Sequence, residues 1–523
     1  MKFFNTGGPV VLEDHYMIDP LSRINLDDVM LLIDQKKYFV LHAPRQTGKT
    51  SLLKALMTHI NQAGHYTCLY VNVEIGQAAR EDVRDAMASI IAMMANQAAL
   101  YLGDRWLKNN LKRLQSLDGS QIMLHNALAE WCEVLDKPLV LFIDEIDALV
   151  GDTLISILRQ LRAGYADRPT GFPQSVTLCG VRDVRDYRIH ASSEKASITG
   201  GSAFNVKVES LRLGNFSQAE TEALLQQHTD TTGQVFDAQA RQSLFQFTQG
   251  QPWLVNALAY EVTSKMKANR DRSVVITAPM IAQAKENLIL LRETHLDQLV
   301  DKLKEPRVHR VIAPILAGAA LSTDMLVDDI EYVYDLGLIE KKPQIRIANP
   351  IYQEVIPREL AWPIQVTLSQ EADWYLDKGL LQMDKLIAAF QAFFRQHSEH
   401  WTDVYQYKEA GPQLLLQAFL QRIVNGGGRI EREYGLGAGR TDLYLEWEHA
   451  TGIQQVILEL KLQYGSRQAT IDEALPQITG YMDRCDTDEG HLLLFNRTKA
   501  SWDEKIFRDQ TSYAGKRIHI WGM

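Results

Sequence analysis

Residues 43–51 have the types and the spacing of a loop that binds phosphate groups. They are Ala43-Pro44-Arg45-Gln46-Thr47-Gly48-Lys49-Thr50-Ser51, in the pattern A/G-x-x-x-x-G-K-[ST]. An apolar run over 38–41 predicts a strand before the loop, and we expect a helix from about Lys49. In that setting, backbone N–H groups and the positive end of the helix point at a triphosphate. A chance Gly-Lys-Thr in an ordinary turn would lack this setting.

Within the loop, three residues have distinct expected roles. We expect Lys49 to reach the β- and γ-phosphates and the Thr50 hydroxyl to bind Mg²⁺. Gly48 lets the backbone approach the phosphate closely, because it has no Cβ. The other residues from Ala43 to Ser51 are predicted to surround the same nucleotide.

Two acids follow an unbroken apolar run over 138–143. Such a run is typical of a central parallel strand that is buried on both faces. We predict that Asp144, at its end, holds the Mg²⁺ shell and that Glu145 polarises the attacking water. The alternative, a core strand followed by a solvated acidic turn, is weakened by the phosphate-binding loop upstream.

A further strand is expected over 175–181, followed by Arg182 and Asp183. In ATPases of this plan, the strand after the acidic one ends in a polar residue that faces the γ-phosphate. Arg182 and Asp183 are both candidates for that sensor. A surface salt bridge remains the alternative for Arg182.

A second constellation lies about four hundred residues further along the chain. Strands are expected over 439–447 and 455–462, with a turn between them. Side chains alternate along a strand, so Glu459 and Lys461 share a face, and the hairpin would bring Asp442 beside them. We predict that Asp442, Glu459 and the Leu460 carbonyl bind Mg²⁺, with Mn²⁺ as the alternative.

This grouping suits the metal-dependent cleavage of phosphodiesters. Lys461 would orient or help deprotonate the water and offset developing charge. Glu409, on an expected helix over 405–424, would extend the metal shell, and Gln477, on a later helix, would contact the phosphate or the water. The alternative is a salt-bridged surface hairpin.

Bulk properties exclude several classes of protein. The 523 residues predict several domains, and the net charge of −10 argues against coating nucleic acid by bulk electrostatics. Four scattered cysteines without a CxxC pair offer neither a zinc site nor a disulfide framework. We see no apolar run long enough to cross a membrane and no secretion signal, so we expect a cytoplasmic protein without membrane contact.

The first constellation resembles a known family of ATPases. Pro44 to Ser51, Ile143-Asp144-Glu145, Gly180 to Val184 and Gly250-Gln251-Pro252-Trp253-Leu254 are similar to the AAA-like, STAND-type branch of P-loop ATPases. The resemblance covers roughly residues 1–290 and implies ATP as the ligand. Its trans-acting arginine finger is not identifiable in this sequence, so assembly into a homo-oligomer is left open.

The second constellation resembles the PD-(D/E)XK nuclease superfamily. Asp442 stands for the D and Glu459-Leu460-Lys461 for the ExK, while Gly439-Arg440-Thr441 and Gln477 to Tyr481 strengthen the match. The family's proline before the Asp is absent. The resemblance covers roughly residues 397–523 and implies nucleic acid, with DNA favoured, as substrate.

An α/β fold with five parts follows from these patterns. We expect a P-loop core with a parallel sheet (1–208), a helical lid (209–290), a winged-helix-like domain (291–360), a helical linker (361–396) and an α/β PD-(D/E)XK domain (397–523). The expected helix before Gly337 is rich in Asp and Glu, which repel phosphates. We therefore favour protein packing over DNA reading for the winged-helix-like part.

Two hypotheses for function follow. The first is an ATP-regulated, metal-dependent DNA nuclease, with defence against foreign DNA or DNA repair as its setting. The second is a non-cleaving ATPase switch or scaffold, whose nuclease-like domain binds nucleic acid or a partner protein.

Overall fold

The computed structural model divides the chain into two compact units. The first contains Met1–Asp297 and Leu326–Ile351, and the second contains Gln298–Met325 and Tyr352–Met523. The predicted winged-helix-like domain, 291–360, is thus shared between the units. The structure describes residues 2–116, 119, 121–183, 188–190, 197–199, 204–291, 301–303, 305–316, 327–360, 375–404, 416, 419–420, 428–436, 439–449, 452–463, 465–496 and 500–523.

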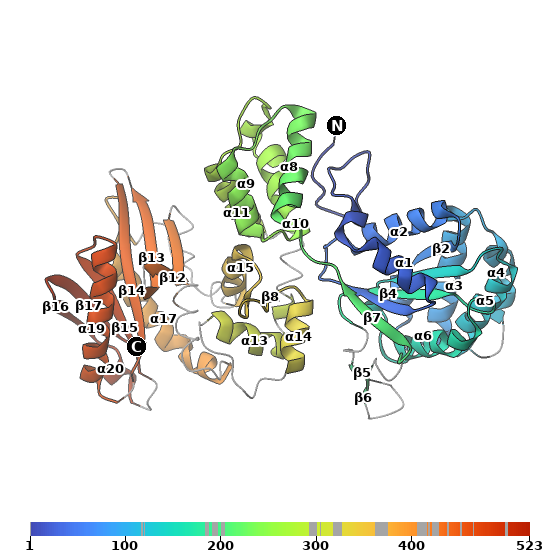
Figure 1. Cartoon of the computed structure of the whole chain (residues 1–523). Helices are drawn as coiled ribbons and strands as arrows, with labels where there is room; N and C mark the ends of the chain where they lie inside the picture. Colours follow the sequence, from blue (N-terminus) through green and yellow to red (C-terminus); the bar gives the residue numbers. More distant parts are fainter. Residues whose placement is uncertain are drawn as a thin grey trace. The chain divides into compact units, whose positions relative to one another are not determined.

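A five-stranded sheet forms the centre of the first unit (Figure 1). Its strand order is β2-β3-β4-β1-β7, and all neighbouring strands are parallel. The continuous apolar runs in the sequence explain this sheet, since strands buried on both faces need no polar alternation. The strands are β1 Tyr38–His42, β2 Thr67–Asn72, β3 Leu139–Asp144, β4 Ser175–Gly180 and β7 Lys207–Arg212.

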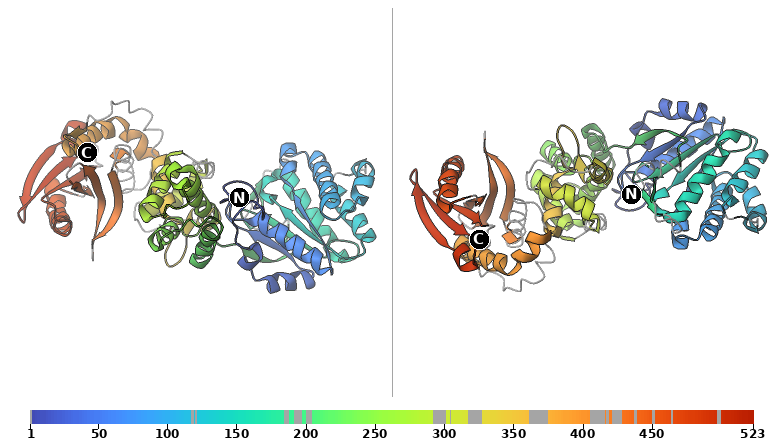
Figure 2. Two further views of the ribbon diagram at one scale, coloured as in Figure 1. Left: turned by 90° about the horizontal axis from the view of Figure 1, so that it is seen from above. Right: turned by 90° about the horizontal axis from the view of Figure 1, so that it is seen from below.

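Helices cover both faces of this sheet (Figure 2). On one face, α1 Leu26–Asp34 and α2 Lys49–Ala63 pack against alternate strand residues, such as Phe39 and Phe142. On the other face lie four helices that pack against residues such as Val40 and Ile143: α3 Val83–Tyr101, α4 Trp106–Ser116, α5 Met123–Val134 and α6 Gly151–Ala163. The predicted parallel α/β sheet is confirmed. A small ribbon joins β5 Arg188–His190 to β6 Ser197–Thr199.

A group of helices follows the sheet, in the range predicted to form a helical lid. Its helices are α8 Gln218–Thr232, α9 Ala238–Thr248, α10 Pro252–Tyr260 and α11 Ala278–Leu291. Ser217 caps α8 in a capping box with Glu220, which satisfies backbone N–H groups that lack a helical partner. Tyr16, in the N-terminal segment, is 1% exposed and packs against Phe4 and His228 of α8.

A helix and a ribbon near residue 340 complete the first unit. Helix α14 Val327–Asp335 ends before Gly337, which has a φ of +76°, and β8 Ile339–Glu340 pairs with β9 Arg346–Ile347. The helix expected before Gly337 is present. Helices α13 Pro306–Leu316 and α15 Pro350–Leu360 precede and follow this segment in the sequence.

A separate mixed sheet forms the centre of the second unit. Its order is β12-β13-β14-β15-β17-β16, antiparallel among the first three strands, parallel from β14 to β17, and antiparallel at β16. Because a parallel pair needs a crossover, the chain passes from β14 to β15 through a helix. The strands are β12 Gly428–Leu436, β13 Gly439–His449, β14 Gly452–Leu462, β15 Glu489–Phe495, β16 Arg508–Tyr513 and β17 Lys516–Gly522.

Among the described residues, a long helix covers each face of the mixed sheet. Helix α17 Met383–Val404 packs through Leu386 and Phe390 on the face that carries Leu458. The crossover helix α19 Arg467–Arg484 packs on the face that carries Ile457. Helix α17 begins within the predicted helical linker, 361–396, and continues to Val404. The small elements β10 Leu376–Asp377, β11 Leu380–Leu381 and α20 Trp502–Lys505 complete the unit.

Within the described ranges, none of the helices is both long and apolar enough to span a bilayer.

Candidate functional site

The predicted phosphate-binding loop lies between β1 and α2. Gln46 and Gly48 adopt positive φ angles of 57° and 94°, and Gly48 immediately precedes α2. Arg45 and Gln46 are exposed, whereas Thr47 and Lys49 are buried. The helix therefore begins at Lys49, as predicted, and its first N–H groups face the turn of the loop.

Hydrogen bonds within the loop hold the side chains of Thr47 and Lys49 in place. The Lys49 ammonium donates to the carbonyl oxygens of Ala43 and Pro44, at 2.9 and 3.0 Å. The Thr47 hydroxyl also donates to the Pro44 carbonyl, at 2.8 Å. At the far end, the Ser51 hydroxyl accepts a bond from the Val10 N–H at 3.2 Å, which connects the N-terminal segment to α2. The lysine is thus held within the concave loop.

The end of β3 brings Asp144 to the first turn of α2. Asp144 is fully buried, and its Oδ2 accepts bonds from the Thr50 hydroxyl at 2.7 Å and from the Tyr70 hydroxyl at 2.9 Å. Burial and the nearby carboxylate raise the pKa of Tyr70, which keeps it a donor. The hydroxyl of Thr50 and the carboxylate of Asp144 are oxygen donors of the kind that Mg²⁺ prefers.

Glu145 follows in a left-handed backbone conformation, with φ 58° and ψ 39°. This conformation is uncommon outside glycine and is a frequent feature of functional sites. Burial, together with Asp147 and Asp144, raises the pKa of the Glu145 carboxyl, while Lys49 and Arg45 oppose the change. Glu145 is half-buried, so a water molecule beside it would meet a base of raised strength.

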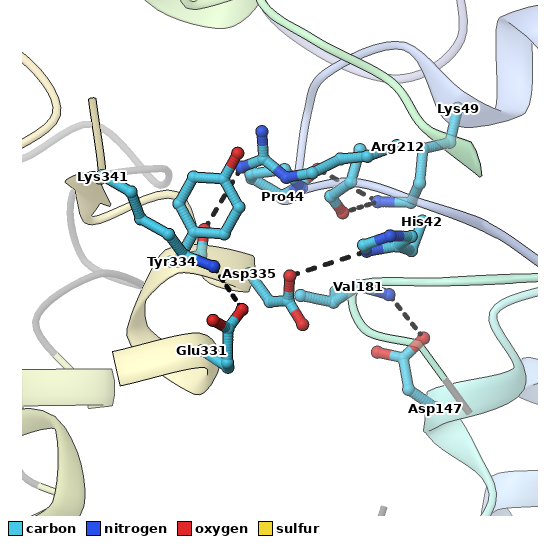
Figure 3. Close-up of polar contacts among 11 residues, drawn as sticks. His42, Pro44, Lys49, Asp147, Val181, Arg212, Glu331, Tyr334, Asp335 and Lys341 are labelled. Atoms are coloured by element: carbon cyan, nitrogen blue, oxygen red, sulfur yellow. Dashed lines mark hydrogen bonds and ion pairs between the residues drawn. The ribbon is translucent and has the colours of Figure 1, made fainter. Parts of the chain in front are cut away.

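Residues of α14 and of the turn after it contact this region from within the same unit. Figure 3 shows Asp335 directed at His42, the last residue of β1, with 3.6 Å between Oδ1 and Nδ1. The Tyr334 carbonyl accepts a bond from Arg212 at 3.2 Å, and the Arg212 guanidinium lies over the Tyr334 ring. At Gly337 a Cβ would come within 2.6 Å of Pro44 in the loop.

Arg182, one of the two candidates for the phosphate sensor, also contacts α14. Its guanidinium lies 4.6 Å from the centre of the Tyr332 ring. The neighbouring Val181 N–H donates to the carboxylate of Asp147, which ties the end of β4 to the segment after β3 (Figure 3). No pattern in the sequence indicated the contact between Arg182 and Tyr332, since α14 lies some 150 residues beyond β4 in the chain.

Arg23 contacts the phosphate-binding loop, although the sequence patterns did not indicate it. It lies in the short 3₁₀ helix Pro20–Arg23 and donates to the Thr47 carbonyl of the loop at 2.6 Å. Only its position a few residues before α1 could have drawn attention to it.

In the second unit, Glu459 and Lys461 lie together on β14. The Lys461 ammonium is 3.0 Å from the Glu459 carboxylate, and Glu459 is 1% exposed. Side chains alternate along a strand, so Glu459 and Lys461 lie on the opposite face of the sheet from Leu458 and Leu460. They share the face of Ile457, which α19 covers. The predicted shared face of Glu459 and Lys461 is confirmed.

The other predicted residues of this site are described in part. Leu443 on β13 pairs with Leu458 on β14, and Asp442 and Glu459 are the next residues along these two antiparallel strands. The side chain of Asp442 lies outside the described residues. Gln477 is exposed on α19 and donates to the Tyr481 hydroxyl at 3.0 Å. Glu409 and the expected helix around it fall mostly outside the described ranges. No group of three or more potential metal ligands occurs among the residues that are described.

The parallel sheet, the loop between β1 and α2, and the acids after β3 define a P-loop ATPase. A protein-family comparison agrees: the family described as "AAA-like domain" matches residues 30–353, more than half of the 523. The chain belongs to the AAA-like domain family. The match ends before the mixed sheet of the second unit.

Several solved structures are similar to this chain at low sequence identity. The Walker-type ATPase PABY2304 of Pyrococcus abyssi is 15% identical, with 68% of this chain and 99% of that chain covered and a TM-score of 0.46. Cdc6p from Pyrobaculum aerophilum is 13% identical (65% and 93% covered, TM-score 0.35), and the Thermotoga maritima RuvB Holliday junction branch migration motor is 12% identical (64% and 95%, TM-score 0.33). Such low scores add nothing to the family assignment. No curated protein matches the chain.

Proposed function

We propose that this ATPase controls a metal-dependent nuclease formed by its own C-terminal domain, residues 397–523, with DNA as substrate. The observation that carries the proposal is the Glu459–Lys461 pair on β14. A carboxylate that is 1% exposed loses the solvation that stabilises its charge. The Lys461 ammonium at 3.0 Å offsets part of that loss, and a bound cation would stabilise the carboxylate in the same way.

The residues of the nuclease site would divide the work between them. Asp442, Glu459 and the Leu460 carbonyl would hold Mg²⁺ or Mn²⁺, with Glu409 as a further ligand, and oxygen donors of this kind suit both ions. When bound, the ion would supply a water of lowered pKa and stabilise the pentavalent phosphate. Lys461 would orient that water, and Gln477 would contact the phosphate from α19.

In the ATPase unit, the loop from Ala43 to Ser51 would bind the phosphates, with Lys49 at the β- and γ-phosphates. Thr50 and Asp144 would hold Mg²⁺, Glu145 would polarise the attacking water, and Arg182 would respond to the γ-phosphate. ATP binding and hydrolysis would then set the state in which the second unit cuts.

The rival proposal is a non-cleaving switch whose second unit only binds nucleic acid or a partner protein. The two proposals differ in what the Glu459–Lys461 pair does. A Glu–Lys pair with a purely structural role would not need a buried glutamate. It would also not need an aspartate such as Asp442 at the next position of the neighbouring strand.

A DNA cleavage assay separates the two proposals. The full chain is incubated with linear and circular DNA, with Mg²⁺ or Mn²⁺, and with or without ATP. We expect cutting that depends on the metal and that E459Q and K461A each lower by at least about 100-fold, because each removes a group that acts on the reacting phosphate.

A matched control is the ion pair between Asp488 and Lys516 on the same sheet, at 3.1 Å. The D488N variant should cut DNA as the unchanged protein does. If neither DNA nor RNA is cut in any condition, the nuclease proposal is wrong and the non-cleaving switch is favoured.

A further inference from the structure

Arg23 joins two backbone carbonyls that are far apart in the sequence. Its Nη1 donates to the Thr47 carbonyl of the phosphate-binding loop, and its Nη2 donates to the Gly214 carbonyl, both at 2.6 Å. The guanidinium also lies 4.7 Å from the centre of the Phe216 ring. One planar side chain thus connects the loop between β1 and α2 to the segment between β7 and α8.

The bond to Thr47 determines how the loop presents a donor. In a trans peptide, the carbonyl and the following N–H point in opposite directions. Because Arg23 holds the Thr47 carbonyl on one side, the N–H of Gly48 is fixed toward the other side. Backbone N–H groups of such a loop are its phosphate donors. Gly48 has a φ of +94°, and a Cβ there would lie 2.9 Å from Nη1, so the loop and Arg23 pack directly on each other.

The other end of the bridge is the start of the lid. The chain leaves the sheet where the Leu213 N–H donates to the His42 carbonyl at 3.0 Å, and it enters α8 after Ser217. Between these points, Phe216 N–H donates to the Gly250 carbonyl of the lid at 2.8 Å. At Gly250 a Cβ would lie 1.9 Å from the Phe216 carbonyl oxygen, so the segment 213–217 and the lid are packed backbone to backbone.

Charge favours the same arrangement. Burial lowers the pKa of the Arg23 guanidinium to about 10, while Glu220 of the α8 capping box opposes this change. Arg23 is therefore a cation at neutral pH. Hydrogen bonds from a charged donor to carbonyls are among the stronger ones, which makes the bridge costly to break.

We propose that Arg23 is a positioning residue that couples the phosphate-binding loop to the lid, so that nucleotide binding and lid position depend on each other. A shift of segment 213–217 moves the Gly214 carbonyl, and the shared guanidinium transmits that shift to the Thr47–Gly48 peptide. In the reverse direction, phosphates that fix the Gly48 N–H also fix the lid's entry segment. The coupling is reciprocal, as thermodynamic linkage requires.

Nucleotide binding to Arg23 variants tests this proposal. The affinity of the full chain for Mg²⁺–ADP is measured by calorimetry, and backbone hydrogen exchange is followed at 43–51 and 213–217. In the unchanged protein, ADP should slow exchange in both segments. We expect R23Q and R23K to weaken ADP binding about tenfold, since each loses charged hydrogen bonds. At saturating ADP, the variants should slow exchange at 43–51 only.

The R23K variant separates positioning from charge. Lysine keeps the cation and the apolar stem, but it lacks the planar fork that reaches two carbonyls at once. If R23K binds ADP and protects segment 213–217 as the unchanged protein does, the charge alone is sufficient and the proposal is wrong. R23K also preserves a folded protein for the test if R23Q is unstable.

Arg168 provides a matched control for a purely structural role. It donates to the carbonyls of Tyr165 and Lys36 and lies over the Tyr38 and Tyr165 rings, at the opposite end of β1. R168Q should lower the melting temperature and leave ADP affinity unchanged. If R23Q behaves like R168Q in both measurements, Arg23 only stabilises the fold and the proposal is overturned.

Discussion

Individual side chains at the nucleotide site are held by bonds that the fold itself provides. Asp144 receives two hydroxyl donors from different elements, and Lys49 is bound by the carbonyls of its own loop. Polar groups of this kind are positioned before a ligand arrives, so less ordering is needed on binding. Glu145 is different, because its surroundings oppose its ionised form.

The raised pKa of the Glu145 carboxyl predicts how the E145Q variant behaves. A carboxyl whose folded pKa is raised stabilises the fold at low pH, and this contribution is lost as pH rises through the folded pKa. At neutral pH the ionised Glu145 therefore costs stability. We expect E145Q to melt at or above the temperature of the unchanged protein at pH 7.5, while ATP turnover falls at least about 100-fold.

The pH profile of turnover gives the second half of this test. Turnover requires ionised Glu145, so it should fall on acidification with a midpoint above the ordinary glutamate value of 4.5. A melting temperature that drops in E145Q, or a midpoint at or below 4.5, would contradict the raised pKa.

Local patterns in the sequence predicted much of what local physics controls. The loop, the start of α2 and the buried strands all depend on residues within a few positions of one another. The contacts of Arg23 with Gly214 and of Arg182 with Tyr332 join residues 150 or more positions apart. No periodicity or motif specifies such pairs, because each depends on how whole elements pack.

At the scale of elements, α14 and the turn after it pack on the nucleotide loop. Asp335, Tyr332 and Tyr334 contact His42, Arg182 and Arg212, which follow or end three adjacent strands of the sheet. The acidic character of α14, which argued against DNA reading, is thus used in part for packing within the ATPase unit.

Substitution of Gly337 should disturb this packing selectively. A Cβ at 337 would come within 2.6 Å of Pro44, so G337A must push the turn away from the loop. The move would separate Tyr332 from Arg182 and so change the position of that arginine relative to the γ-phosphate. We expect ATP affinity to rise several-fold relative to ADP affinity, as measured by calorimetry with a slowly hydrolysed ATP analogue.

Gly233 supplies the matched control for G337A. Its φ of +78° imposes the same backbone strain on alanine, but a Cβ there meets nothing within 4 Å. G233A should lose about 1–2 kcal/mol of stability and keep the ratio of ATP to ADP affinity. If G337A leaves that ratio unchanged as well, α14 does not influence the phosphate sensor.

At the scale of the whole molecule, the chain combines an ATPase with a second unit built on its own mixed sheet. The AAA-like match covers residues 30–353 and leaves that sheet outside. Two units with separate cores can act independently or be coupled, and their folds are compatible with either arrangement.

Trapping the ATPase in one nucleotide state distinguishes coupling from independence. E145Q should retain bound ATP because the attacking water lacks its base, whereas K49A should bind no ATP because the β- and γ-phosphates lose their lysine. If ATP controls the second unit, these variants hold it in opposite states. We therefore expect their rates of metal-dependent DNA cutting to differ by at least about tenfold when ATP is present, and to converge when ATP is absent. Equal rates with ATP, in a protein whose cutting still requires Glu459, would mean that the two units work independently.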